Sequence, residues 1–578
     1  MNNKVDSARK KIAILGCGPR GLYSLECLVI QLSQPLIKKI PFILIFDDCK
    51  DPGAGQVWKI NQNEANWINI SVQHLSELKE RHSIEIEGIE IPKFPSFMEW
   101  AEQHNFYQKT NILTFPPRSV MGRYLSERFQ SIAQPLIQQE VLTLYKERIV
   151  KVLSIGKAVV LQSTTNKQYT VDECLVTVGH QPVSLSEETK RWQLLANKYS
   201  LDFVKNPYDE DRLHKIDTRN IAIRGMGLAM IDVIRLFAFK FGYFIDSGDS
   251  PFCEYECDNS KSFHITPYSP DGLPPVPKPY TTEIDKIFDP GEDVKKSFKE
   301  KIGNLIQDVK DESFVEEFLY SMVEIVVDLY FEKNECFRKS SSTKSEIRKI
   351  LFTWFKDMSH KHELILDTDL DCKVYMEQTV LMAHNLTEIS LDYMAMQVWR
   401  HLQPTMYALF SHCDLPDKIM EKVVELDENS KRYTFGPPVD SITQLIALSD
   451  MGMLDFTFAK NPSIEVTKEG WRMHNNTSTK NAKVMIDSVL GSPLAKDIAS
   501  PLFINLIEEG ALIPVSAKLG FKTSKDARIF ESYDTVHNSS LCMIGRYCKG
   551  SVLGVDAILE CFGREAEDWS ASVIKRLK

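Results

Sequence analysis

The chain has 578 residues, of which 43% are hydrophobic and 26% are charged, and its formal net charge is −10. This length exceeds one ordinary core, so we expect two or three domains. The acidic balance, without a concentrated Lys/Arg face, excludes a general nucleic-acid role. No run of about 18 uncharged apolar residues and no signal-peptide-like stretch occur, so we expect no membrane span and a cytoplasmic location.

The 12 cysteines are scattered along the chain. Cys253 and Cys257 lack the second pair of ligands that a zinc site needs. We therefore expect reduced thiols and no metal site.

The first predicted elements are a strand over 12–15, a tight turn and a helix that continues to Leu32. The turn carries Gly16, Gly18 and Gly21 in a GxGxxG motif. Gly16 suits the tight turn, Gly18 allows a backbone approach to a pyrophosphate, and Gly21 allows close helix–strand packing. The following helix N-terminus favours phosphate.

The next predicted strand, 42–46, ends at Asp47 and Asp48. A carboxylate at this place can bind the hydroxyls of a ribose. Together these elements predict a dinucleotide site rather than a purely structural glycine turn, and the N-terminal position favours FAD.

A second strand–turn–helix unit begins near Asn220, with Gly225 and Gly227 in its turn. Ala229 stands near the place of a third glycine, so an ordinary strand–helix turn remains the alternative. A second nucleotide unit is what an enzyme that delivers hydride to a flavin needs.

Between Thr281 and Lys431 apolar residues recur at helical spacing, and α/β character returns after Gly436. The expected fold class is α/β, with two Rossmann-like dinucleotide-binding domains and an inserted all-helical subdomain that could form a substrate lid. The expected parts are 1–215 (FAD domain, first part), 216–280 (NAD(P)H domain, first part), 281–432 (helical insertion), 433–529 (NAD(P)H domain, second part) and 530–578 (FAD domain, C-terminal part).

Beyond these patterns, the chain resembles FAD/NAD(P)-binding proteins related to flavin-dependent N-hydroxylating monooxygenases. The similarity is greatest to the branch that acts on amino acids, where oxygenation of aspartate to nitrosuccinate is one known activity. It covers roughly 10–280 and 433–578. The matching segments are 16–21, 46–47, 53–58, 67–70, 115–118, 122–125, 178–182, 225–229, 436–438, 500–502, 544–546 and 550–557.

The resemblance implies that FAD and either NADPH or NADH serve a monooxygenase. Its substrates would be O₂ and a small amine or amino acid, oxygenated at the amine nitrogen through a flavin hydroperoxide. Two alternatives stay open: a flavin-dependent oxidase or reductase without substrate oxygenation, and a non-catalytic flavoprotein that binds a protein partner. A homo-oligomer is compatible with the sequence.

The site residues follow from the same motifs. His180 and Arg118 are the candidate catalytic residues, with a hinge histidine and a solvated surface arginine as the alternatives. The candidate cofactor-binding residues are Gly16, Gly18, Gly21, Asp47, Gly55, Trp58, Arg123, Gly179, Gly225, Gly227, Gly545, Gly550, Gly554 and Asp556.

The nucleotide preference is predicted from one departure from the family pattern. Relatives commonly carry an arginine that pairs with the 2′-phosphate of NADPH, and Pro270 occupies that place here. Asp271 beside it would repel a 2′-phosphate, whereas Lys261 or Lys278 could replace the missing cation. We therefore expect no strong preference for NADPH over NADH.

Overall fold

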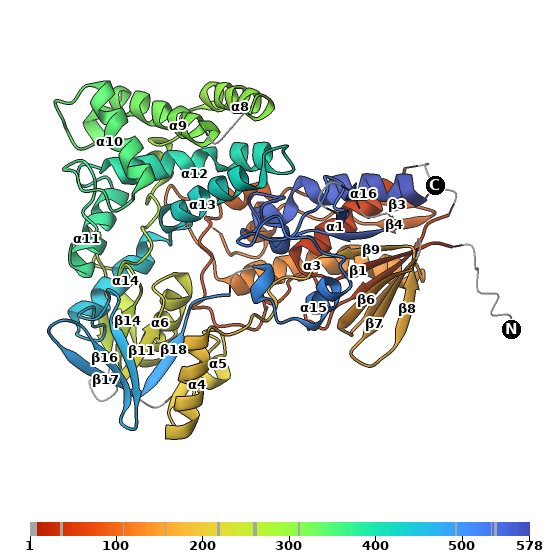
Figure 1. Cartoon of the computed structure of the whole chain (residues 1–578), viewed down its shortest axis with the longest axis horizontal. Coiled ribbons are helices and arrows are strands. Elements are labelled where there is room, and N and C mark those ends of the chain that lie inside the picture. The colour runs from red at the N-terminus through yellow and green to blue at the C-terminus, as the bar shows by residue number, and fades with distance from the viewer. Residues whose placement is uncertain are drawn as a thin grey trace.

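The computed structural model describes residues 9–34, 39–107, 109–155, 158–216, 220–257, 263–309, 313–491, 494–532, 535–536 and 540–577. Figure 1 shows three parts: a unit around one parallel sheet on the right, a second such unit at the lower left, and a block of helices above it. The predicted fold class is confirmed.

The first sheet is parallel, with strand order β21-β9-β1-β2-β5. Its central strand is a continuous buried apolar run, as expected for a parallel strand that is covered on both faces. The strands are β1 (Lys11–Leu15), β2 (Phe42–Phe46), β5 (Leu142–Tyr145), β9 (Glu173–Val176) and β21 (Leu541–Met543).

Helices α1 (Pro19–Leu32), α3 (Arg118–Gln138) and α16 (Arg564–Leu577) belong to this unit, and α1 packs against the other two. An antiparallel sheet of β6 (Ile149–Ile155), β7 (Ala158–Ser163) and β8 (Gln168–Val171) also belongs to it. Smaller elements complete the unit: β3 (Ile84–Ile86), β4 (Ile89–Ile91), α2 (Phe97–Gln103), α15 (Pro501–Glu508), β19 (Phe530–Ser532) and β20 (Thr535–Val536).

A buried charge cluster fixes α1 within this unit. Glu26 of α1 accepts hydrogen bonds from Arg81 at 3.0 Å and from Arg128 of α3 at 2.9 and 2.8 Å. All three side chains are at most 4% exposed. Because buried charges are costly unless paired, this cluster defines how α1 and its glycine turn sit on the sheet.

The second sheet is also parallel, with order β10-β18-β11-β14. Its strands are β10 (Asp202–Val204), β11 (Asn220–Arg224), β14 (His264–Tyr268) and β18 (Val484–Asp487), and the neighbouring helices are α4 (Glu187–Tyr199), α5 (Glu210–Leu213), α6 (Leu228–Phe241) and α14 (Val439–Asp450). Antiparallel ribbons add β12 (Gly242–Ile245) with β13 (Glu254–Cys257), and β15 (Ser463–Thr467) with β16 (Gly470–His474) and β17 (Thr479–Ala482).

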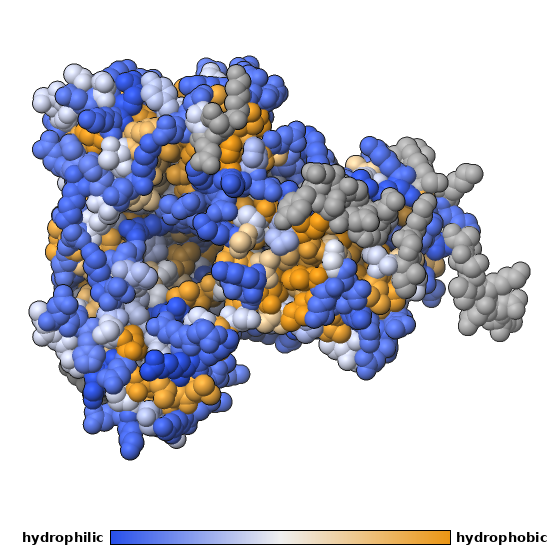
Figure 2. Space-filling view, in the orientation of Figure 1, coloured by the Kyte–Doolittle hydropathy of each residue, from blue (hydrophilic) through white to orange (hydrophobic). Residues whose placement is uncertain are grey.

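The helical block lies between β14 and α14 in the chain. We define it as α7 (Thr282–Lys286), α8 (Glu292–Gln307), α9 (Ser313–Glu332), α10 (Lys344–Lys356), α11 (Cys372–Ala383), α12 (Leu391–Phe410) and α13 (Asp417–Thr434). Its apolar residues share one core with those of the second sheet. Figure 2 shows the molecule hollowed between this block and the second unit.

The structure differs from the expected domain boundaries at both crossings between the two units. β10 pairs with β18 of the second sheet, and α15 packs on β6 of the first unit. The two crossings lie side by side, because the Ser184 N–H donates to Asp497 O at 2.6 Å and Val183 forms a β-bridge with Ile498. We propose boundaries near Ser184 and Asp497, where the sequence carries no change in composition.

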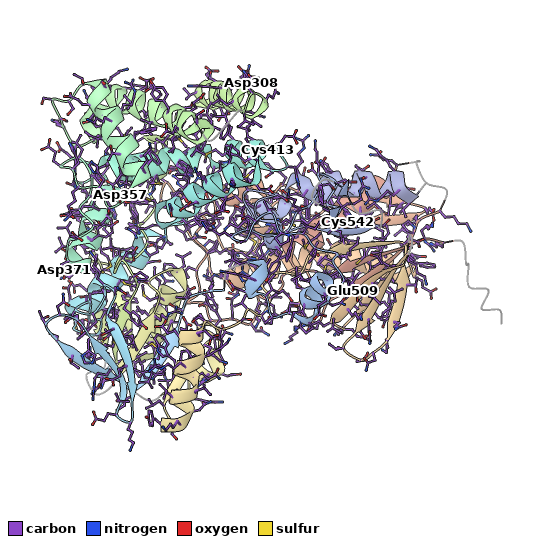
Figure 3. All side chains as sticks on the ribbon, viewed as in Figure 1. Asp308, Asp357, Asp371, Cys413, Glu509 and Cys542 are labelled. Atoms are coloured by element: carbon purple, nitrogen blue, oxygen red, sulfur yellow. The ribbon has the colours of Figure 1, made fainter. Side chains whose placement is uncertain are left out.

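Within the described residues, no helix is long and apolar enough to cross a membrane. All 12 cysteines have free thiols. They are spread over the molecule, with Cys413 after the helix α12 and Cys542 on β21, as Figure 3 shows.

Replacing Glu26 with glutamine should lower the free energy of unfolding by about 3–5 kcal/mol, since two buried guanidinium groups lose their counter-ion. Denaturant unfolding followed by tryptophan fluorescence measures this loss. Glu187→Gln is the control, because Glu187 pairs with Lys190 at 2.7 Å while 90% exposed, and it should change little. Equal stabilities of the two variants would show that the buried cluster does not anchor α1.

Candidate functional site

The glycines of the first turn have separate structural roles. Gly16 has φ +87, and its N–H donates to Phe46 O at 2.8 Å. A Cβ on Gly21 would lie 2.3 Å from Gly16 O, so α1 packs on the turn without a side chain between them. Gly18 has φ −77 and its Cβ would meet nothing nearer than Gly55 Cα at 3.7 Å. The space beside Gly18 is therefore left for a ligand at the helix N-terminus.

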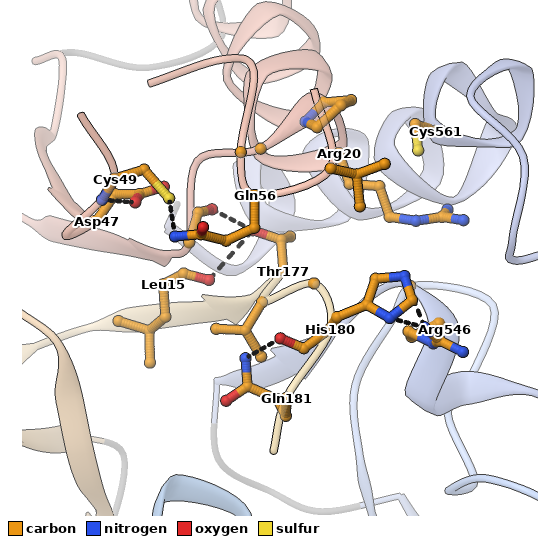
Figure 4. A pocket seen from close by; sticks show the side chains of 18 of the residues that line it. Leu15, Arg20, Asp47, Cys49, Gln56, Thr177, His180, Gln181, Arg546 and Cys561 are labelled. Atoms are coloured by element: carbon orange, nitrogen blue, oxygen red, sulfur yellow. Dashed lines mark hydrogen bonds between the residues drawn. The ribbon is translucent and has the colours of Figure 1, made fainter. Parts of the chain in front are cut away.

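Asp47 lies at the end of β2 and lines this space (Figure 4). One carboxylate oxygen accepts the N–H of Cys17 in the glycine turn, and the other accepts the N–H of Cys49 at 2.7 Å. The carboxylate thereby holds the turn against the strand end and keeps lone pairs for a ribose hydroxyl. Asp48 beside it pairs with Arg148 at 2.8 Å. Ribose binding by Asp47 stays a prediction.

His180 faces the same cavity from the segment after β9 (Figure 4). The Arg546 guanidinium contacts both ring nitrogens, with Nη1 2.7 Å from Nε2. Burial and the positive charge of Arg546 lower the pKa of His180 to about 4, so the imidazole is neutral at physiological pH and accepts from the guanidinium. His180 thus has the structural hydrogen bond of the hinge alternative while it lines the cavity.

The closing segment, which we define as 554–563, forms a wall of this cavity. Buried Arg20, on the first turn of α1, donates to Val555 O at 2.8 Å and to Glu560 O at 2.9 Å. Asp556 pairs with Lys431 of α13 at 2.7 Å. Burial alone would raise the pKa of Asp556, but Lys431 and Arg546 hold it below its usual range.

Asp556 does not lie in a helix, although a helix begins a few residues later. Residues 554–558 have no helical structure, a 3₁₀ turn follows at Leu559–Phe562, and α16 begins at Arg564. The hydrogen bonds from Arg20 shape this segment instead, and they join residues more than 500 positions apart.

The cofactor cavity, as we call this space, encloses about 1300 Å³, part of it open to solvent. It brings together nine of the residues expected at the site. These are Gly16, Gly18, Asp47, Gly55, Trp58, Gly179, His180, Gly545 and Asp556. Arg20 and Arg546 also line it; sequence reasoning did not select them, although Arg20 lies inside the glycine motif and Arg546 follows Gly545 directly.

The three remaining glycines of the first unit have packing roles outside this cavity. Gly21 closes the turn, as described above. A Cβ on Gly550 would lie 2.8 Å from Leu519, and one on Gly554 would lie 2.4 Å from the ring of Tyr407. Gly554 lines a second cavity instead.

Two predicted arginines also lie elsewhere. Arg118 pairs with buried Asp232 of α6 at 2.7 Å, and the hydroxyl of Tyr208 donates to the same carboxylate at 3.1 Å. Arg123 is exposed and lies over the ring of Phe106, 5.4 Å from its centroid. Neither arginine lines either of the two cavities, so Arg118 joins the two nucleotide units and Arg123 has no part in the cofactor cavity.

The second glycine turn repeats the geometry of the first. Gly225 has φ +96, and its N–H donates to Tyr268 O at 2.8 Å. Gly227 caps α6 with φ −85, and a Cβ there would meet no atom within 4 Å. Arg224 and Asp487 form an ion pair at 3.1 Å where their strands end.

The structure gives less support to the residues from which we expected no strong preference for NADPH over NADH. Asp271 pairs with Arg432, so its charge is compensated. Lys278 lines the second cavity, away from this turn. Lys261 lies outside the described residues.

The second cavity encloses about 1890 Å³, part of it open to solvent, and adjoins the cofactor cavity at Ala557, which lines both. The helical block, the first unit and the closing segment all contribute to it. Its apolar lining includes Ile70, Leu113, Phe115, Pro404, Phe435 and Leu559, and its charged or polar lining includes Asn69, His74, Lys278, Asp285, Arg400, Lys525, Glu560, Arg564, Glu565 and Asp568.

Asp285 is the counter-ion for several of these groups. Arg400 donates to it, and His74 and His401 each place Nε2 3.5 Å from its carboxylate. Burial would raise the pKa of Asp285, but Arg400 and the two histidines hold it well below its usual range. The charge of Arg400 is therefore compensated.

Lys278 differs from Arg400, because no carboxylate of the described residues lies within ion-pair distance of it. Its Nζ donates to the main-chain oxygen of Asn69. Burial, and then the charge of Arg400, lower the pKa of Lys278 to about 7. Burial also raises the pKa of Glu560, at the wall toward the cofactor cavity, to about 7.

These features define a class of protein. Two parallel sheets, each with a strand that leads through a glycine turn into a helix N-terminus, are two dinucleotide-binding units. Residues 13–181 match the FAD-NAD(P)-binding family. This match confirms the predicted cofactor class, FAD with NADH or NADPH.

The chain is also similar in sequence to individual proteins. The uncharacterized protein YdhS of Escherichia coli (strain K12) is 25% identical over 280 residues, which are 46% of each chain. An L-aspartate N-monooxygenase (nitrosuccinate-forming) of Streptomyces davaonensis is 23% identical over 252 residues, 39% of this chain and 38% of its own. The expected resemblance is thus confirmed at low identity, and the matches span less than half of either relative.

Among solved structures, L-lysine 6-monooxygenase from Pseudomonas syringae covers 98% of this chain and 99% of its own. The TM-score is 0.44 and the identity is 11%.

Gly18→Val and Gly227→Val separate the two nucleotide sites. Both glycines have negative φ, and the nearest atom to a new Cβ lies at 3.7 Å or beyond, so both variants should fold. Gly18→Val should yield colourless protein, because the side chain occupies the place of the pyrophosphate. Gly227→Val should keep FAD and lose reduction by either nucleotide. Absorbance near the flavin maximum and anaerobic stopped-flow reduction measure these effects; stoichiometric FAD in Gly18→Val would contradict the assignment.

Lys278 should make stability depend on pH. Its pKa is about 7 in the folded protein, against about 10.4 for an unfolded lysine, so the folded state binds fewer protons between these values. Stability should therefore rise with pH across this window, and Lys278→Met should remove the rise. The variant Lys278→Met should have a higher free energy of unfolding than wild type. This difference should be largest below pH 7 and should shrink toward pH 10. Thermal unfolding across pH tests this, with Lys525→Met, an exposed lysine on the same cavity, as the control.

Proposed function

We propose that the protein is an FAD-dependent monooxygenase that uses NADH or NADPH and oxygenates the amine nitrogen of a small amine or amino acid. The observation that carries the proposal is that Ala557 lines both cavities, so only the closing segment lies between them at this point. A molecule in the second cavity would lie beside whatever occupies the cofactor cavity. The similarity to an aspartate N-monooxygenase supports nitrogen as the atom oxygenated.

The residues fit a bound dinucleotide. Gly18 and Gly55 leave the helix N-terminus open, and Asp47 lies where a ribose would be held. FAD, when bound, supplies the redox chemistry: it takes a hydride from the nicotinamide and activates O₂. The overall reaction converts R–NH₂, O₂, NAD(P)H and a proton into R–NHOH, NAD(P)⁺ and water.

The residues of this chain position the substrate and exclude water. The closing segment lies between the two cavities, and Arg20 of α1 and Lys431 of α13 both hold it. The neutral imidazole of His180 accepts from Arg546 and therefore leaves the cavity without a titrating histidine at neutral pH. The helical block covers the second cavity through α12, which contributes Arg400 and Tyr407.

The purified protein should be yellow, and NADH or NADPH should bleach it under argon. With oxygen and the right substrate, nucleotide oxidation should yield an equal amount of product that is heavier by one oxygen atom. Incubation with the common amino acids and polyamines, followed by mass spectrometry and a peroxide assay, tests this. Peroxide as the sole product with every compound would favour an oxidase, and a flavin that no nucleotide bleaches would favour a non-catalytic flavoprotein.

A further inference from the structure

Lys278 is the cation of the second cavity that is withdrawn from solvent and has no carboxylate within ion-pair distance among the described residues; Lys525 and Arg564, on the same cavity, are exposed. Arg400 has Asp285 as its partner, whereas Lys278 has only the main-chain oxygen of Asn69. Lys278 is half-buried, and it lines the cavity. A buried ammonium group without a counter-ion is costly, and an anionic ligand would remove that cost.

The position of Lys278 is fixed by its neighbours in the chain. It follows Pro277, whose main-chain oxygen accepts from the buried hydroxyl of Tyr393 at 3.0 Å. The Lys278 N–H donates to Pro437 O at 3.1 Å, which ties the segment to the start of α14. The ammonium group therefore reaches the cavity from a segment held on both sides.

The surroundings restrict what kind of anion fits. Much of the lining is apolar, with Leu113, Phe115, Pro404 and Phe435 among the contributing side chains. The half-buried ammonium group of Lys278 in such surroundings suits the carboxylate of a small organic molecule.

The wall of the second cavity that faces the cofactor cavity carries a carboxyl group. Glu560 lies there, and the charges that act most on it are Arg20, Asp556 and Lys431, whereas Arg400 and Asp285 act on Lys278. Glu560 and Lys278 thus have different charged neighbours and belong to different parts of one cavity. A molecule with a carboxylate and an amine can meet both.

We propose that Lys278 is a specificity-determining residue of the second cavity, where it pairs with a carboxylate group of the amine substrate. This inference rests on the proposed function and deepens it, since it selects amino acids over polyamines. The lysine acts by binding, so its role can be measured without turnover.

The experiment measures ligand binding to the FAD-loaded protein by calorimetry and by the difference spectrum of the flavin, at constant ionic strength. The probes are matched pairs: each common amino acid and the amine that remains after its α-carboxylate is removed, together with succinate and its uncharged diamide. Wild-type protein should bind at least one carboxylate and should bind its matched neutral or decarboxylated partner far more weakly.

Lys278→Met should weaken binding of that carboxylate roughly 10- to 100-fold, the effect of one charge-assisted hydrogen bond. Lys278→Arg should restore most of it, and Lys190→Met, at an exposed lysine that lines neither cavity, should leave it unchanged. Lys525→Met tests the other lysine of the same cavity. A melting temperature no lower than that of wild type and an unchanged flavin content in Lys278→Met would exclude misfolding.

Three outcomes would overturn the proposal: no carboxylate binds, amines bind as well as their parent amino acids, or Lys525→Met causes the loss instead of Lys278→Met. Failure of the proposed function is distinguishable from these, because it would show as carboxylate binding through Lys278 without any oxygenated product.

Discussion

The absence of two side chains governs how the first unit is built. With Gly16 in a left-handed conformation and Gly21 against its carbonyl oxygen, α1 begins directly at the edge of the sheet. Any β-carbon at Gly21 would push the helix away from that edge. The helix N-terminus therefore opens into the cofactor cavity, and Arg20, Asp47 and the closing segment are arranged around it. The buried cluster at Glu26 holds the same helix at its middle.

The two cavities differ in whether the cationic side chains that line them have counter-ions. In the cofactor cavity, the lining arginines have counter-ions: Arg20 lies 3.7 Å from Glu565, Arg148 lies 2.8 Å from Asp48, and Arg546 lies 3.8 Å from Asp556. In the second cavity, the half-buried Lys278 has no carboxylate within ion-pair distance among the described residues. A cation placed in this way costs stability, so its explanation is sought in what the cavity binds.

Local patterns in the sequence predicted the parts of the fold that depend on local geometry. The buried strands, the two glycine turns and the helical block all follow from spacing and backbone conformation. Contacts between distant parts of the chain could not be predicted in this way. The hydrogen bond from Arg20 to Glu560 O and the pairing of β10 with β18 have no signature in the local sequence. Lys278 illustrates the limit: the sequence suggested a nucleotide phosphate as its partner, while the fold carries it to the other cavity.

The order of strands in the first sheet has a consequence for biosynthesis. β21, near the end of the chain, pairs with β9, which is made some 360 residues earlier, as the register Leu541 to Cys174 shows. Until β21 has been translated, the first sheet therefore lacks its edge strand, and the cofactor cavity is open on one side. Such long-range pairing is slow to form. The nascent chain cannot enclose a nucleotide in this cavity before residues 545–558, which form one of its walls, have been translated.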